Sequence, residues 1–155
     1  MAFNPGSPVT GATVTGLTTP TYTLTQMQAP VPNGKQYAVT ALGGTQTGVE
    51  VNSISKPFTV TMFVPAHPRG LPAASPTTGI IKDIPVNTCK LLFRKGAQPA
   101  ANQAAQLNSI EVRINTAAGV DVYEPEEVKA LISFAGGLIF ANAAGIEETV
   151  RTGAL

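Results

Sequence analysis

Apolar and polar residues alternate through most of residues 1–122 and recur at helical spacing from residue 123 onwards. Side chains two positions apart share a face of a strand, so the alternation predicts strands over 12–17, 21–27, 36–41, 49–64, 86–95 and 107–116. The dipeptide Asn33-Gly34 predicts a hairpin turn, and turns are also expected at 18–20 and at Gly43-Gly44, which would end the returning strand. Residues 1–11 and 65–85, rich in proline and glycine, predict an irregular arm and a long loop.

The C-terminal pattern predicts two helices. Pro125 suits a first helical turn, and the glutamates around it place negative charge at the positive end of the helix dipole. One apolar stripe follows, formed by Val128, Leu131, Ile132, Ala135, Leu138 and Ile139. Gly136-Gly137 lies off this stripe and costs roughly 1 kcal/mol per glycine, which a closely packed neighbour would offset. A break at 142–145 and a short helix over 146–152 are expected next.

Strands followed by helices indicate an α+β fold in a single domain over residues 1–155, with a β region over 1–122 and a helical region over 123–155. The expected parts are an N-terminal β-hairpin, an antiparallel sheet of about five strands and two C-terminal helices. The helical hairpin is too apolar to stand alone, so it needs a broad surface to lie on.

The two faces of the predicted sheet differ in chemistry. Along 86–95, Cys89, Leu91 and Phe93 point one way, toward the expected position of the helices, and the other face carries mainly hydroxyl groups and cations. That second face suits contacts with sugar and phosphate groups through Thr59, Thr61, Thr88, Lys90, Arg94, Arg113 and Asn115. The alternative is an ordinary solvated sheet face on which some of these residues, with Glu111, only pair across strands.

Composition adds a charge asymmetry. Charged residues make up only 12% of the chain, about half the usual share, as expected where partners cover much of the surface or in a loop-rich β domain. Residues 1–110 carry seven Lys/Arg and two Asp/Glu, a net +5, and residues 111–155 carry three and seven, a net −4. A basic first part and an acidic helical part are relevant to nucleic-acid binding.

Little catalytic chemistry is present. The single histidine, His67, lies near prolines in a predicted loop, and the single cysteine, Cys89, is expected to face the helices, so neither a nucleophilic pair nor a common zinc site is predicted. The glutamates near Pro125 are explained by a helix start. No enzyme, cofactor, metal or small-molecule substrate is predicted. No signal peptide or membrane span is indicated, so we expect the protein to be made and used in a cytoplasm.

The order of these motifs resembles the coat proteins of single-stranded RNA bacteriophages, the levivirus group. Residues 86–96 (VNTCKLLFRKG) are similar to the central strand of that family and residues 109–115 (SIEVRIN) to its last strand. Residues 123–128 (YEPEEV) are similar to its helix entry, and residues 144–155 (AGIEETVRTGAL) to the tail of many members. Residues 1–50 and 65–85 match less well and are where the extra length is expected.

The resemblance implies an intertwined dimer with one continuous sheet, in which the helices of each subunit cross onto the partner through the apolar stripe. Dimers would assemble in the bacterial host cytoplasm into an icosahedral shell, the capsid of the virion, around genomic RNA, with loops such as 65–85 or 96–106 at symmetry axes. Members of the family also bind an RNA hairpin and repress replicase translation, and the hydroxyl and cationic residues named above are the candidate contacts. Leu92 and Glu111 depart from a polar, cationic face, which favours general RNA contact over a specific hairpin.

A non-viral, self-assembling structural or adhesive β-protein without RNA binding is the alternative. That class requires export, which the missing signal peptide disfavours.

Overall fold

The computed structural model describes residues 3–154, so the first residues of the predicted arm and the last residue of the tail lie outside the described part. The strands are β1 (Val9–Thr10), β2 (Leu17–Met27), β3 (Gly34–Gln46), β4 (Phe58–Phe63), β5 (Val86–Ala97) and β6 (Gln106–Ala117). The helices are α1 (Val120–Tyr123), α2 (Pro125–Ala141) and α3 (Ala143–Thr152). The predicted α+β order is confirmed.

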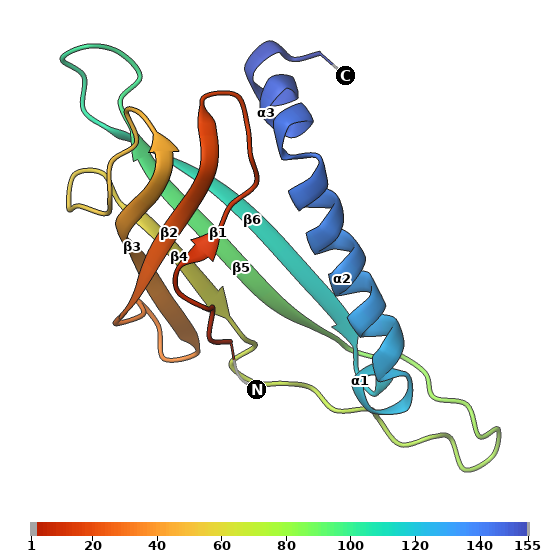
Figure 1. Cartoon of the computed structure of the whole chain (residues 1–155). Helices are drawn as coiled ribbons and strands as arrows, with labels where there is room; N and C mark the ends of the chain where they lie inside the picture. The colour runs from red at the N-terminus through yellow and green to blue at the C-terminus, as the bar shows by residue number, and fades with distance from the viewer. Residues whose placement is uncertain (1–2, 155) are drawn as a thin grey trace.

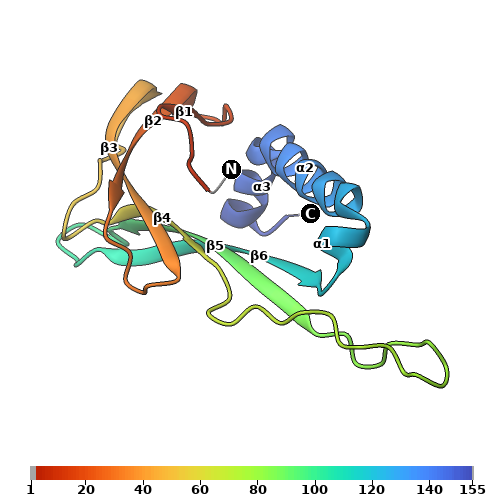
Figure 2. The ribbon, with the colours of Figure 1, turned by 90° about the horizontal axis from the view of Figure 1, so that it is seen from below.

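The six strands form one antiparallel sheet in chain order, with β1 and β6 at its two edges (Figure 1). Figure 2 shows that β1, β2 and part of β3 rise from one side of the β4–β6 strands, and that the helices lie on the same side. The core sits where β3 is paired with β2 on one side and with β4 on the other, and its buried apolar side chains there are Tyr37, Ala38, Val39 and Val60. The sheet has six strands rather than about five because the two-residue β1 pairs with β2.

The N-terminal strands differ from the prediction. Among residues 12–17, Leu17 is the first residue of β2 and the only other pairing is the isolated bridge from Val14 to Leu17, so the strand predicted there was wrong. The turn predicted at 18–20 was also wrong: β2 runs through it with a shift of register and a φ of 45° at Thr19. β3 continues past Gly43-Gly44, because these glycines let its backbone approach β2. A Cβ at Gly44 would overlap the carbonyl oxygen of Thr19. Alternation alone does not reveal such irregularities.

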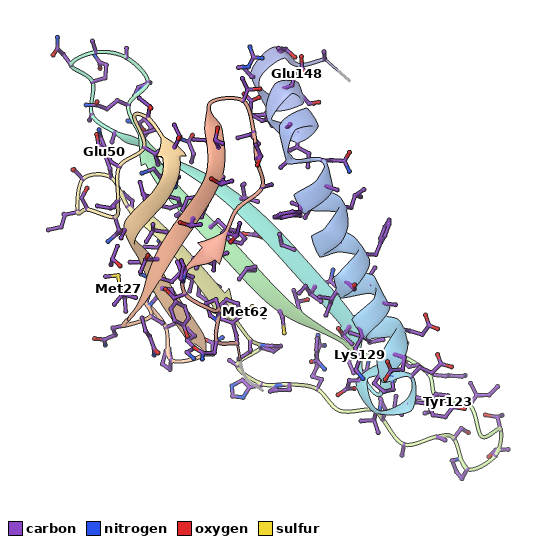
Figure 3. The ribbon with its side chains drawn as sticks, in the orientation of Figure 1. Met27, Glu50, Met62, Tyr123, Lys129 and Glu148 are labelled. Carbon is purple, nitrogen blue, oxygen red and sulfur yellow. The ribbon has the colours of Figure 1, made fainter. Side chains whose placement is uncertain are left out.

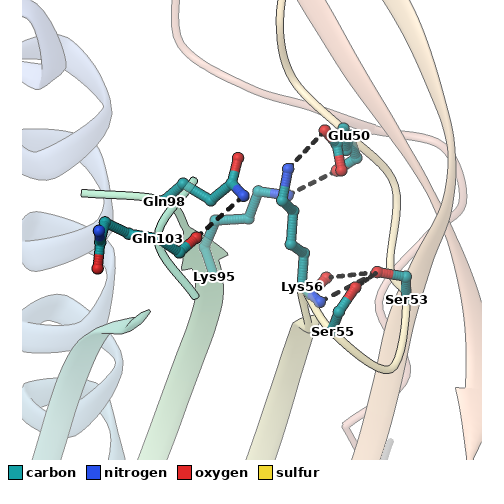
Figure 4. A network of polar contacts seen from close by, with 7 residues as sticks. All are labelled: Glu50, Ser53, Ser55, Lys56, Lys95, Gln98 and Gln103. Atoms are coloured by element: carbon teal, nitrogen blue, oxygen red, sulfur yellow. Dashed lines mark hydrogen bonds and ion pairs between the residues drawn. The ribbon is translucent and has the colours of Figure 1, made fainter. Parts of the chain in front are cut away.

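The extended region predicted over 49–64 is a strand only at β4, and the preceding residues form a loop fixed to β5 by polar contacts (Figure 4). Lys56 Nζ lies 2.7 Å from Glu50 Oε1, and Lys95 Nζ donates to the Glu50 carbonyl oxygen at 2.6 Å. The hydrogen bond from Lys56 holds the pKa of the Glu50 carboxyl below its usual value, and burial lowers the pKa of Lys95. The loop is therefore attached to the end of β5 that leads into residues 98–105.

The helical region begins earlier than predicted. α1 was not expected, α2 starts at Pro125 as predicted, and α3 starts at Ala143, so the break is confined to Asn142. Within residues 3–154, no single helix is long and apolar enough to cross a membrane; α2 and α3 reach that length and composition only together, and they are bent by 65°.

Candidate nucleic-acid and subunit interfaces

The predicted RNA contacts lie together on one face of β4, β5 and β6. The register places Thr59 opposite Arg94, Lys90 opposite Arg113 and Thr88 opposite Asn115. Residues directly opposite each other in an antiparallel pair share a face, and so do residues two apart along a strand. We call this surface the basic face, defined by Thr59, Thr61, Thr88, Lys90, Arg94, Arg113 and Asn115.

Part of the basic face is buried. Thr59 is 5% exposed, and Thr61 is fully buried beside Gln36 on β3, a residue that the sequence pattern did not predict for this face. Thr61 Oγ1 donates to Gln36 Oε1 at 3.1 Å, and Arg94 Nη2 donates to the same oxygen at 3.2 Å. Thr59 Oγ1 and Arg94 Nε are buried and have no hydrogen-bond partner among residues 3–154. At this end of the basic face, the polar side chains therefore bond to one another inside the sheet rather than facing solvent. Gln36 could be identified only from the pairing of β3 with β4.

The exposed part of the basic face lies on β5 and β6. The side chains of Lys90 and Arg113 are 36% and 68% exposed, and both contact Glu111. Lys90 Nζ lies 3.6 Å from Glu111 Oε2, and Arg113 Nε donates to Glu111 Oε1. The hydrogen bond from Arg113 is the main cause that lowers the pKa of the Glu111 carboxyl. The cross-strand pairing considered as an alternative is thus present at Glu111, yet the cations outnumber this anion.

The opposite face of the sheet is apolar and incompletely covered. Phe93 is 40% exposed and Ile110 is 67% exposed, although both side chains belong to the face that was expected to carry the helices. Figures 1 and 2 show α2 running beside β6, the edge strand, on the side of the sheet from which β1 and β2 rise. The strands β5 and β6 therefore present apolar area that their own helices do not bury.

The helical stripe is equally uncovered. Within the described helices no residue is buried, and the larger side chains of the stripe are about half exposed, from Ile132 at 49% to Leu131 at 60%. Val128 and Ala135 are half-buried. Beside Gly136 and Gly137 an added Cβ would meet no atom within 4 Å. In the view of Figure 3, side chains on the side of α2 away from β6 point outward, and no other segment of residues 3–154 is drawn beside them. The stripe is therefore not covered by other described residues of the same subunit.

The loop between β4 and β5 is anchored at its start. The backbone N–H of Arg69 donates to Asn87 Oδ1 at 2.9 Å, and Asn87 Nδ2 donates to the Arg69 carbonyl oxygen at 2.8 Å. An open cavity of about 610 Å³ lies between this segment and α1, lined by Leu71 and Val122 among others. Among residues 3–154, no group of three or more His, Cys, Asp or Glu is placed to hold a metal ion.

Comparison with solved structures gives two informative similarities. The subunit in the virus-like particle of bacteriophage ESE020 superposes with a TM-score of 0.95 and 46% identity, over 99% of this chain and 100% of that chain. The subunit in the virus-like particle of Beihai levi-like virus 32 gives a TM-score of 0.53 and 14% identity, over 86% of this chain and 88% of that one, which supports the fold alone. Neither a family model nor a curated protein matches the chain.

Proposed function

The chain belongs to the coat proteins of the levi-like bacteriophages, and we propose that its dimers assemble into a closed icosahedral shell around single-stranded genomic RNA. The observation that carries the structural role is the end-to-end similarity to the subunit of a virus-like particle. It points to a capsid protein of the virion rather than to an enzyme. Assembly would take place in the cytoplasm of the bacterial host.

The uncovered surfaces support a dimer as the building unit. The helical stripe and the apolar face at Phe93 and Ile110 are both left open within one subunit. Burying a Leu, Ile or Phe side chain that is half exposed contributes roughly 1 kcal/mol, so several such residues together stabilise association by several kcal/mol. Helices that cross onto the apolar face of a partner would cover both surfaces at once.

The free strand edge supports the same dimer. β6 is twelve residues long and uninterrupted by a bulge, and within the described part of the chain it is paired only on the side of β5. A long unpaired edge is a liability that proteins cover or pair. Pairing β6 with the β6 of a second copy would remove it and join two sheets into one.

The basic face would then contact RNA on the side of the joined sheets that faces away from the helices. Lys90 and Arg113 are the accessible cations, whereas Arg94 is held by Gln36 and the hydroxyl groups of Thr59 and Thr61 are buried. Lysine and arginine side chains commonly contact phosphate groups, and such contacts carry no sequence information directly. General RNA contact is therefore better supported than recognition of a specific hairpin with repression of translation.

RNA contact is tested with Lys90→Ala combined with Arg113→Ala. Each lost phosphate contact reduces the slope of log affinity against log salt by about 1, measured on dimers with single-stranded RNA. Lys129→Ala, a cation on α2 that lies on the helix side, is the matched control and leaves the slope unchanged. An unchanged slope in the double variant would remove these residues from the RNA interface.

Shell formation is tested separately by the size of the purified protein. We expect particles on size exclusion and in negative-stain images, with RNA inside that added nuclease does not remove. Elution as a monomer at every concentration would contradict the proposal.

A further inference from the structure

We propose that two copies of β6 pair around a twofold axis that passes beside Val112, so that Glu111 of each copy lies opposite the partner's Arg113. This inference rests on the proposed dimer and adds to it the register and the residues that select it. It follows from the direction of the backbone groups of β6, from the two faces of the sheet, and from the order of charges along the strand.

The backbone of β6 shows which groups are free to pair. The N–H of Ala118 donates to the carbonyl oxygen of Pro85, so even-numbered residues of this uninterrupted ladder direct their N–H and C=O groups toward β5. Backbone groups alternate in direction along a strand. The outward groups at the edge therefore belong to the odd-numbered residues Leu107, Ser109, Glu111, Arg113 and Asn115, a row of donors and acceptors available to a second strand.

The two faces of the sheet restrict the register. Opposite residues in an antiparallel pair place their side chains on the same face. A continuous sheet with one apolar and one basic face therefore pairs odd positions with odd positions and even with even. A symmetric dimer that satisfies this condition has its twofold axis beside one residue, never between two.

The charges then choose among the possible centres. An axis beside Glu111 places Glu111 opposite itself, and an axis beside Arg113 places Arg113 opposite itself; like charges directly opposite each other are destabilising. An axis beside Ile110 or Ile114 reduces the number of residue pairs between the two β6 strands. It also places Val112 opposite a polar residue of the partner, at position 108 or 116 respectively. These four centres each leave an unfavourable pair.

The centre beside Val112 pairs each residue with a suitable neighbour. Glu111 meets the partner's Arg113, and Ser109 meets the partner's Asn115, all on the basic face. On the apolar face, Ile110 meets the partner's Ile114, and Val112 meets itself. The pairing uses nearly the whole of Gln106–Ala117. Glu111, already in contact with Lys90 and Arg113 of its own chain, would lie at the centre of a network shared by both copies.

Cysteine cross-linking tests the register directly. In a Cys89→Ala background, Val112→Cys places two thiols in a non-hydrogen-bonded pair with Cα atoms about 4.5 Å apart, within the range of a disulfide. We expect most of this variant to become a covalent dimer under mild oxidation. Ile110→Cys and Ile114→Cys are matched controls on the same face: each alone stays uncross-linked, because like positions lie about 13 Å apart along the strands, and a mixture of the two cross-links.

Charge reversal provides a second, independent test. Glu111→Arg and Arg113→Glu each set like charges opposite one another twice per dimer, and each is expected to raise the dimer dissociation constant about tenfold. The double variant exchanges the two charges and is expected to return to within about threefold of the wild-type value. With an axis beside Glu111 or Arg113, the double variant would not bring the dimer dissociation constant back toward the wild-type value.

The results of these experiments distinguish failure of the proposed register from failure of the proposed dimer. Cross-linking of Ile110→Cys or Ile114→Cys alone, or no recovery in the charge exchange while the protein remains dimeric, would overturn the Val112 register and leave the dimer standing. A wild-type protein that stays monomeric at every concentration by sedimentation equilibrium would overturn both.

Discussion

Apolar side chains are about as frequent in β3 and β4 as in α2. They are buried where β3 pairs with β4, and they are exposed in α2. At the junction of β3 and β4, Tyr37, Val39 and Val60 are buried, and even the polar Thr61 is fully enclosed. In α2 no side chain is buried, although Leu131 and Ile139 belong to a regular apolar stripe. The first region is buried within one chain, whereas the apolar stripe of the second is left exposed.

This difference predicts that substitutions in the two regions affect different properties, the stability of the subunit in one case and the association of subunits in the other. A change at the β3–β4 junction should destabilise the subunit itself, because its cost falls on contacts within one chain. A change on the helical stripe should leave the fold of the strands intact and act on association. The following predictions test that separation, from the largest expected effect to the smallest.

The largest effect is expected from Leu131→Asp combined with Ile139→Asp. Two carboxylates on a surface that a partner must desolvate cost several kcal/mol, so particle yield should fall by about 100-fold or more. Far-ultraviolet circular dichroism should retain the sheet signal. Lys129→Asp on the same helix, off the stripe, is the control for added charge and should still assemble. Normal particles from the double variant would show that the stripe is not an interface.

An intermediate effect is expected from Gly44→Ala in β3. Gly44 has a φ of 73°, and a Cβ there would overlap carbonyl oxygens of Thr18 and Thr19, so the free energy of unfolding should fall by about 3 kcal/mol. Gly48→Ala is the matched control: Gly48 has a φ of 81° but open space around it, and the cost should be about 1 kcal/mol. Equal losses in thermal or denaturant unfolding would indicate that the close approach of β2 and β3 contributes nothing.

The smallest effect on stability is expected from Gly136→Ala combined with Gly137→Ala. Alanine favours a helix by up to about 1 kcal/mol over each glycine, so helicity of the dissociated subunit should rise slightly. If a partner packs closely against this flank, particle yield should fall at the same time. Gly145→Ala in α3, also beside open space, controls for helix propensity alone. A gain in both helicity and assembly would show that no neighbour approaches Gly136 and Gly137.

The long strands and the start of α2 were predictable because their signals are local. The alternation of apolar and polar residues over 86–95 and 107–116 matches β5 and β6 within a few residues, and Pro125 marks the first residue of α2. The strand boundaries before residue 57 were not predictable. There the register shifts at Thr18–Thr21 and the approach permitted by Gly44 depend on which strand lies alongside, and no residue pattern within a strand carries that information.

By itself, the amino-acid sequence determined that two kinds of surface exist: an apolar stripe on a helix, and polar strand faces, one with Lys90 and Arg94 and another, on the next strand, with Arg113. Side-chain periodicity follows from backbone geometry, so these faces are set before any tertiary contact forms. Only the tertiary structure decided which of those residues reach solvent. Packing β3 against β4 encloses Thr61 and engages Arg94 with Gln36, whereas Lys90 and Arg113, nearer the free edge, remain exposed, because burial depends on neighbours brought together from distant parts of the chain.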